Sequence, residues 1–241
     1  MTGTAEREWA FEKYFRKKAF KGMLRAGIEG LKKAAREVRE AAAEDPLAGA
    51  EGAVRLLERF PKALADLDDS SSQIQTAVEQ TTGTLVRIIA AAPANLERRE
   101  EWLDRLWAAY EDDDAWWTEP MAERWGELCA GEELALHWGE LFAELTEIEW
   151  CANPDRPTYF RGVVIGLSAL LAAGRHEQIL ELLELEPGKA WCCRIFGVKA
   201  LAAMGRKAEA LEYAEECRKE DEYYGPIAEV CEALLLSSGF A

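Results

Sequence analysis

The sequence lacks the long apolar runs and the leader pattern that mark membrane and secreted proteins. Spanning a bilayer takes about 18 consecutive apolar residues, and the longest apolar stretches, at residues 85–92 and 163–173, are shorter. The first residues, MTGTAE, lack the charged and then apolar layout of a signal peptide. These absences predict a cytoplasmic protein without a transmembrane segment.

The sequence also has few of the residues and none of the motifs on which common catalytic sites are built. It has only two histidines, His137 and His176, and neither has a second histidine or a cysteine at metal-ligand spacing. No GxxxxGK[ST], GxGxxG, GxSxG, HExxH or CxxC pattern occurs. We therefore expect no catalytic residues, no cofactor and no metal, and we interpret the protein as a non-enzyme. An enzyme whose site carries no known motif is the weakest of three functional hypotheses; the other two are a protein-binding scaffold and a nucleic-acid-binding subunit.

Strand-forming signals are scarce, and helix-forming residues replace them. Alanine, leucine and glutamate dominate, β-branched residues are few, and no stretch alternates apolar and polar residues. Apolar residues recur at helical spacing between breaks such as Asp45-Pro46, Pro61, Pro93, Asp112–114 and Asn153-Pro154. The pattern predicts an all-α fold of antiparallel helical hairpins with more than about 65% helix and no sheet. The six scattered cysteines are expected to be free, mostly buried thiols.

Charge is distributed very unevenly along the chain. The net charge is −16, yet residues 1–40 carry a net charge of +5 and residues 101–150 carry −13. We therefore expect three segments: a basic helical segment at 1–68, acidic, tryptophan-rich helical hairpins at 69–156 and a third segment at 157–241. The acidic body argues against a general nucleic-acid binder, because it repels phosphates over most of its surface.

The basic segment interleaves cations with aromatic residues in KYFRKKAFK at 13–21. Residues 5–40 as a whole are expected to be helical, with two helices or a kink where Gly22, Gly27 and Gly30 weaken the middle. The favoured interpretation is that the aromatic side chains pack on the fold while the cations face water. The alternative is contact with RNA, DNA, an anionic membrane surface or another protein. The candidate contact residues are Lys13, Arg16, Lys17 and Lys18.

Seven of the nine tryptophans fall among the fifteen acids of residues 101–150. The favoured interpretation places most of them in the core with the acids on the outside. The alternative is a surface for a basic peptide, which would combine cation–π contacts with nearby carboxylates. Trp116 and Trp117 are the candidates for exposure, because they follow the run Asp112, Asp113 and Asp114 between two expected helices.

Three segments of the C-terminal third align without gaps: LSALLAAG at 167–174, VKALAAMG at 198–205 and EALLLSSG at 232–239. The final glycines are 31 and 34 residues apart, and an amphipathic segment follows the first two. These features resemble the tetratricopeptide repeat family, which pairs two helices in about 34 residues. The resemblance covers about residues 158–241 and implies an α-solenoid in that third of the chain.

The resemblance also implies details of packing. It predicts that Gly174 and Gly205 occupy hairpin turns with positive φ, where glycine lacks the penalty of a Cβ. Five positions later the family has a small residue; Ala210 fits that pattern, whereas Ile179 departs from it and predicts looser packing. The third repeat stops after its glycine, so we expect either a longer parent chain or a partner that completes the end.

A helical-repeat surface usually binds extended peptides or neighbouring subunits. Our first hypothesis is therefore a non-enzymatic protein-binding scaffold or adaptor whose partner is another protein or peptide. The second hypothesis is a regulatory subunit of a nucleic-acid-handling complex that contacts RNA or DNA through its basic N-terminal helix.

Overall fold

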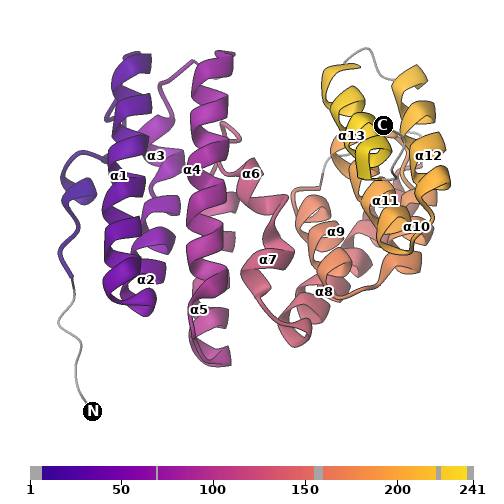
Figure 1. The fold of residues 1–241 in the computed structure, drawn as a ribbon, viewed down its shortest axis with the longest axis horizontal. Helices are drawn as coiled ribbons and strands as arrows, with labels where there is room; N and C mark the ends of the chain where they lie inside the picture. The colour runs from indigo at the N-terminus through magenta and orange to yellow at the C-terminus, as the bar shows by residue number, and fades with distance from the viewer. Residues whose placement is uncertain (1–6, 69, 155–159, 221–223, 238–241) are drawn as a thin grey trace. The chain divides into compact units, whose positions relative to one another are not determined.

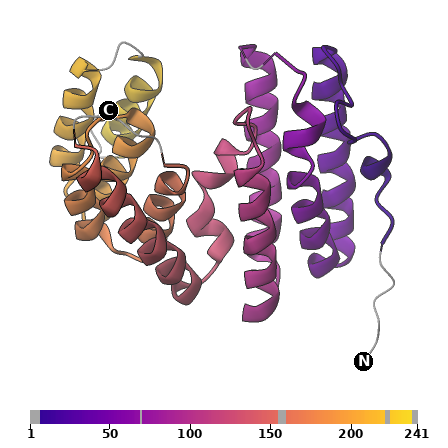
Figure 2. The same ribbon diagram turned by 180° about the vertical axis from the view of Figure 1, so that it is seen from behind.

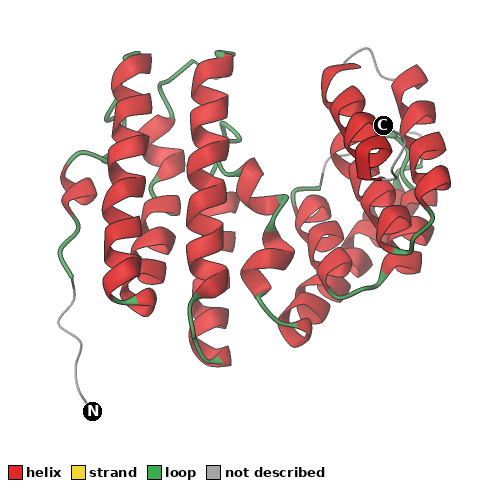
Figure 3. Ribbon diagram, in the orientation of Figure 1, coloured by secondary structure: helices red, strands yellow, loops and turns green. Residues whose placement is uncertain are grey.

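A computed structural model describes residues 7–68, 70–154, 160–220 and 224–237 of the chain. The structure is 75% helical, and the described residues form no strand (Figure 3). The expected all-α fold is thereby confirmed. None of the described helices is both long enough and apolar enough to cross a membrane. All six cysteines are free, and three of them are buried.

The chain divides into two compact units, at residues 1–130 and 131–241. Unit 1 contains the long helices α1, α4 and α5, the shorter helix α2, and several helices of four or five residues (Figure 1). They are η1 (Ala10–Lys13), α1 (Leu24–Glu44), α2 (Pro46–Leu57), α3 (Phe60–Leu64), α4 (Ser72–Ala91), α5 (Leu96–Glu111), α6 (Glu119–Ala122) and α7 (Trp125–Cys129).

The core of unit 1 lies where α4 packs against α1 and α2, which run side by side with it in Figures 1 and 2. Buried Leu31, Leu56 and Ile74 come from these three helices. Gly49 of α2 allows close approach to α1, because a Cβ at this position would lie 2.3 Å from Ala42 Cα. The expected boundary between residues 68 and 69 therefore does not separate compact units, since α4 shares one core with α1 and α2.

Local sequence signals begin and end several of these helices. Asp45 is the N-cap of α2, and its side chain accepts hydrogen bonds from the Leu47 and Ala48 backbone N–H groups. Pro46 follows at the first helical position, where its missing N–H costs nothing. Asn95 caps α5 by accepting a 3.0 Å hydrogen bond from the Arg98 N–H. These helix boundaries fall where the sequence predicts them.

Two expected helical stretches are interrupted. Residues 14–23 are not helical, because Lys18, Lys21 and Gly22 have positive φ. The helix expected after the aspartate run at residues 112–114 consists instead of two short helices, α6 and α7, which are separated by a turn at residues 123–124.

Unit 2 consists of helices that pack mainly on their neighbours in the sequence. They are α8 (Glu132–Ala152), α9 (Gly162–Ala172), α10 (His176–Glu184), α11 (Trp191–Ala203), α12 (Lys207–Glu220) and α13 (Tyr224–Ser237). The extensive contact between α8 and α9 crosses the expected boundary at residues 156 and 157, so the two helices belong to one unit.

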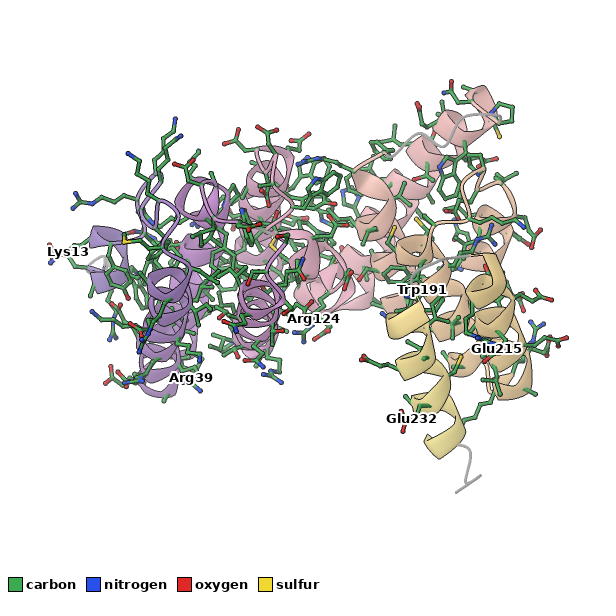
Figure 4. The ribbon with its side chains drawn as sticks, turned by 90° about the horizontal axis from the view of Figure 1, so that it is seen from above. Lys13, Arg39, Arg124, Trp191, Glu215 and Glu232 are labelled. Carbon is green, nitrogen blue, oxygen red and sulfur yellow. The ribbon has the colours of Figure 1, made fainter. Side chains whose placement is uncertain are left out.

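A small apolar cluster joins α11, α12 and α13. Its buried members include Val198, Ala210 and Ile227, and Trp191 packs against its rim (Figure 4). Ala210 is thus in the core, as the spacing from Gly205 predicts. Ile179, the departure from the small-residue pattern, is also fully buried, and α9 packs on α10 less extensively than α11 packs on α12.

Gly174 and Gly205 end α9 and α11 in the same way. Their φ values are +71° and +78°, which confirms the predicted left-handed turns. After each glycine, the next N–H bonds back to a carbonyl five residues earlier: Arg175 to Leu170 and Arg206 to Leu201, both at 2.9 Å. This is the Schellman arrangement, and it occurs twice at a spacing of 31 residues. The third aligned glycine, Gly239, lies outside the described residues.

Candidate functional site

The tryptophan-rich segment is mostly core. Trp117 is 3% exposed, so the expectation that it lies on the surface is wrong, whereas Trp116 is 47% exposed with a φ of +62°. Of the other tryptophans in residues 101–150, Trp107 is half-buried and the rest are buried. The buried ones are Trp102, Trp125, Trp138 and Trp150.

The three aspartates before Trp116 lie in three different environments. Asp113 is buried, which contradicts its expected surface position. Its carboxylate accepts hydrogen bonds from the Thr118 N–H at 2.6 Å and hydroxyl at 2.7 Å, and from the Ala115 N–H at 3.2 Å. An aspartate whose carboxylate accepts hydrogen bonds from the backbone N–H groups of the residues that follow it stabilises a turn. The position of Asp113 between two expected helices was the sequence signal for this role. Asp112 and Asp114 remain exposed, and Asp112 pairs with Lys62 at 3.0 Å.

The basic segment presents its cations to water over a buried aromatic base. Phe11, Phe15 and Phe20 are buried, and the Phe15 and Phe20 rings meet edge to face at 5.2 Å. Their burial against unit 1 agrees with the favoured interpretation of this segment. The candidate cations Lys13 (Figure 4), Arg16, Lys17 and Lys18 are all exposed, and Lys18 pairs with Asp66 at 3.0 Å.

A groove of about 1560 Å³ in unit 1 is lined by charged residues of α2 and α5. At its centre, Glu51 accepts hydrogen bonds from Arg98 at 2.9 Å, Arg105 at 2.9 Å and the Trp102 indole N–H at 3.0 Å. Arg55, one helical turn from Glu51, adds a 3.1 Å bond. Burial alone would raise the pKa of Glu51, but the hydrogen bonds from Trp102, Arg105 and Arg55 lower it to about 2.

Other ion pairs extend this network across the groove. Arg105 makes a bidentate pair with Glu58 at 2.8 and 2.9 Å, and Arg59 bonds Glu12 at 2.9 Å. The sequence shows the pattern only as charges at helical spacing on two separate helices, Glu51, Arg55 and Glu58 on one and Arg98, Glu101 and Arg105 on the other. Because these charged side chains pair with one another across the groove, we interpret the network as ion pairs that hold α2 and α5 together.

The outward side of α8 carries a row of exposed apolar side chains. Leu141, Leu145 and Ile148 are 43%, 42% and 59% exposed. Their spacing of four and three residues places them on one line along the helix. We call these three residues the α8 stripe. A contiguous row of exposed apolar side chains marks an interaction surface more often than an isolated one does.

The inward side of α8 explains why the stripe is left uncovered. Trp138, Phe142 and Trp150 are buried on that side, and α9 is the only described element with which α8 makes extensive contact. Gly139 and Gly166 bring the two helices close, since a Cβ at Gly139 would lie 3.0 Å from the Leu170 nitrogen. The apolar residues of α8 therefore form two rows, and α9 covers only one of them.

Glutamates border the α8 stripe on one flank. Glu140, Glu144 and Glu147 are exposed, and we call them the α8 glutamates. At 3.6 residues per turn they fall on the same side of the stripe. In the described part of the chain, none of the three has an ion-pair partner. The helix carries six glutamates in total and no lysine or arginine.

The α8 stripe and its flanking glutamates were not among the residues predicted to form a binding site. The sequence of α8 does contain a signal for such a surface. Its apolar residues occupy more of the helix circumference than a single buried face requires.

Comparisons of the chain with protein-family models, with curated proteins and with solved structures found no match.

Proposed function

We propose that this protein is a non-enzymatic scaffold or adaptor that binds another protein through helical surfaces of unit 2. The observation that carries the proposal is the α8 stripe, an ordered row of apolar side chains on a helix that α9 covers on one side only. Leaving three large apolar side chains in water costs about 25 cal/mol per Å² of apolar surface, which a partner would recover on docking.

The proposal includes the hypothesis that α9 to α13 form tetratricopeptide-like repeats. It is supported by the repeated Schellman turns at Gly174 and Gly205 and by packing that joins α9 to α11 and α11 to α12. In a solenoid, an end helix normally turns a polar face outward. We infer that α8 occupies such an end position in unit 2, and its apolar outer row then points to a docking role.

Site-specific photocrosslinking tests the proposal. A benzophenone amino acid is placed at position 141, 145 or 148 of the full chain in the cells that produce it. The matched control positions are 96 and 185, where Leu96 and Leu185 are similarly exposed. We expect a discrete adduct from the α8 positions that is absent at the controls. Identical adduct patterns at all five positions, or no adduct at any, would overturn the proposal.

A second candidate function is contact with RNA or DNA through unit 1. The exposed cations of residues 13–17 and the exposed Lys32, Arg36 and Arg39 of α1 favour it. Phosphate contacts release counterions, so binding through them weakens steeply with salt. Titration of the full chain with a labelled single strand and a labelled duplex between 50 and 300 mM salt tests this candidate, and it is abandoned if no affinity appears at the lowest salt.

A further inference from the structure

We propose that the α8 stripe docks a basic amphipathic helix, with the partner's apolar row against the stripe and its lysines or arginines beside the α8 glutamates. The inference rests on the proposed protein-binding function and names the chemistry of the partner. It is carried by the juxtaposition of an exposed apolar row with exposed, unpaired carboxylates on a single helix.

The shape of the surface fits a helix better than an extended peptide. Leu141, Leu145 and Ile148 follow the seam spacing with which one helix packs along another. Exposed His137 and Ala152 extend the same line by about one turn at each end. The seam then covers 16 residues whose ends lie about 22 Å apart along the helix, which a partner of four turns would match.

The charge on the surface determines the sign of the partner. The α8 glutamates lie beside the apolar row, in the position from which flanking charges select partners in helix pairs. A cationic flank on the partner would pair with them, whereas an acidic flank would be repelled. Unlike Glu51, whose arginine partners lie within unit 1, these carboxylates have no cation on their own helix.

A second copy of the chain fits the surface poorly. Its own α8 would bring six more glutamates and no lysine or arginine to the seam, and like charges in contact oppose association. Its basic segment at residues 13–21 has the right charge, but its aromatic side chains Phe15 and Phe20 are buried within unit 1. That segment therefore has no matching apolar row to offer.

Designed peptides test the inference on the full chain. The probe is a labelled 18-residue helix with leucines on one face and lysines on the flanks. Two controls keep the helix and change one feature: glutamates replace the lysines, or serines replace the leucines. By fluorescence anisotropy at 50 mM salt, we expect the lysine–leucine peptide to bind at least tenfold more tightly than either control. We also expect its affinity to fall several-fold at 300 mM salt as the charges are screened.

Matched variants place the binding on α8. The variant L141S/L145S/I148S should weaken binding of the lysine–leucine peptide at least tenfold, while L47S/L96S/L185S, at similarly exposed positions, should change it less than twofold. The variant E140Q/E144Q/E147Q should weaken it about fivefold. Its control, E97Q/E100Q/D104N, removes the same number of exposed charges from α5 and should have less than a twofold effect. Circular dichroism verifies that each variant remains folded.

Each other outcome is decisive. Equal binding of lysine and glutamate peptides would overturn the basic partner but retain an apolar docking surface. Equal losses in the α8 variants and their controls would mean general attraction to an acidic chain, which overturns the inference. Concentration-dependent self-association that disappears in L141S/L145S/I148S would assign the surface to a second copy. No binding of any peptide would also overturn the inference, whereas a crosslinked adduct at position 145 would still support the proposed function.

Discussion

Glu51 of unit 1 and Glu186 of unit 2 both face arginines, yet their pKa values move in opposite directions. Burial raises the pKa of Glu186, and its partners do not reverse that effect. The Ala190 N–H donates to one of its oxygens at 2.6 Å, and the Arg194 Nε forms an ion pair with the other at 2.8 Å. Hydrogen bonds from Trp102, Arg105 and Arg55 instead lower the pKa of Glu51 to about 2, despite its burial.

The difference shows that the balance between lost hydration and gained donors decides whether a buried carboxylate favours its charged form. The Glu51 side chain is 17% exposed and meets three arginines, whereas the Glu186 side chain is 4% exposed and meets one. The α8 glutamates are a third case, because they are exposed to water and have no cationic partner among the described residues. Unit 1 thus uses its charges to join its helices, and unit 2 leaves a row of charges unused by its own fold.

Glycine serves two purposes in this chain: close packing of helices, and positive-φ turns such as the one at Gly22 of unit 1. In unit 1, Gly49 and Gly52 lie where a Cβ would collide with Ala42 and Trp9. In unit 2, helix–helix glycines occur between α8 and α9, but Gly174 and Gly205 have open space around them and are required by their backbone conformation. The positive-φ glycine at a helix end is the role that recurs along the sequence, at Gly174 and again 31 residues later at Gly205.

Removing the arginine beside Glu186 is the strongest test of the contrast between the two glutamates. R194M leaves a buried carboxylate facing an apolar side chain, so we expect a loss of about 3 kcal/mol in unfolding free energy at pH 8. A group with a raised folded pKa contributes stability below its unfolded pKa, about 4.3 for glutamate, and loses it as pH rises through the folded pKa. The loss should therefore shrink as pH falls, as urea unfolding at pH 5 and pH 8 can show.

The double variant R194M/E186Q is the control for this experiment. Without a carboxylate to bury, it should recover most of the lost stability at pH 8 and show little pH dependence. A loss in R194M that is the same at both pH values would mean that Arg194 acts through packing and through its 2.7 Å bond to the Tyr213 hydroxyl, not through Glu186.

The opposite pH dependence is expected for Glu51. E51Q keeps the shape of the side chain but removes the charge that four donors share, which should cost on the order of 2–3 kcal/mol at pH 7. A lowered folded pKa gives stability that is present above the unfolded pKa and is lost as pH falls through the folded value. The difference between wild type and E51Q should thus persist down to about pH 5 and fade toward pH 2, measured by urea unfolding. E97Q, on an exposed part of α5, should show no such difference.

The glycine contrast can be tested at Gly205. G205V should lose about 1–2 kcal/mol of stability through backbone strain, because a Cβ there meets nothing within 4 Å and the φ of +78° disfavours a β-branched residue. G205N should lose clearly less, since asparagine tolerates the left-handed conformation. Thermal unfolding of the two variants measures both effects, and equal melting temperatures would contradict the assigned turn.

The smallest effect on stability is expected on α8. E140Q/E144Q/E147Q removes three exposed carboxylates that have no described partner, so its unfolding free energy should stay within about 0.5 kcal/mol of wild type. This outcome, beside the large effect of E51Q, would sharpen the distinction between charges that serve the fold and charges left for a partner. A loss above 1 kcal/mol would assign the α8 glutamates to the fold.

Much of the fold could be predicted from local signals. Asp45-Pro46 and Asn95 set the starts of α2 and α5 because a short polar side chain can accept the first free N–H groups. Gly174 and Gly205 set the ends of α9 and α11 because only a residue without a Cβ adopts positive φ at little cost. Each signal acts within a few residues, so the sequence alone reveals it.

The candidate site could not be predicted in the same way. Trp116 and Trp117 are neighbours of the same type, yet one is exposed and the other buried, because the turn held by Asp113 directs only Trp117 inward. Leu141, Leu145 and Ile148 look like core residues of an amphipathic helix until α9 is seen to cover the opposite row. Helical periodicity alone determines neither outcome.

By itself, the sequence determined that this chain is helical, where several helices begin and end, and that two hairpin turns need glycine. Those properties depend on capping, periodicity and backbone sterics, which act over one or two turns. Only the tertiary structure decided which carboxylates find arginines and which apolar row is covered, because both depend on how different helices pack against one another. The paired Glu51 and the unpaired α8 glutamates are the same residue type, and their surroundings alone separate them.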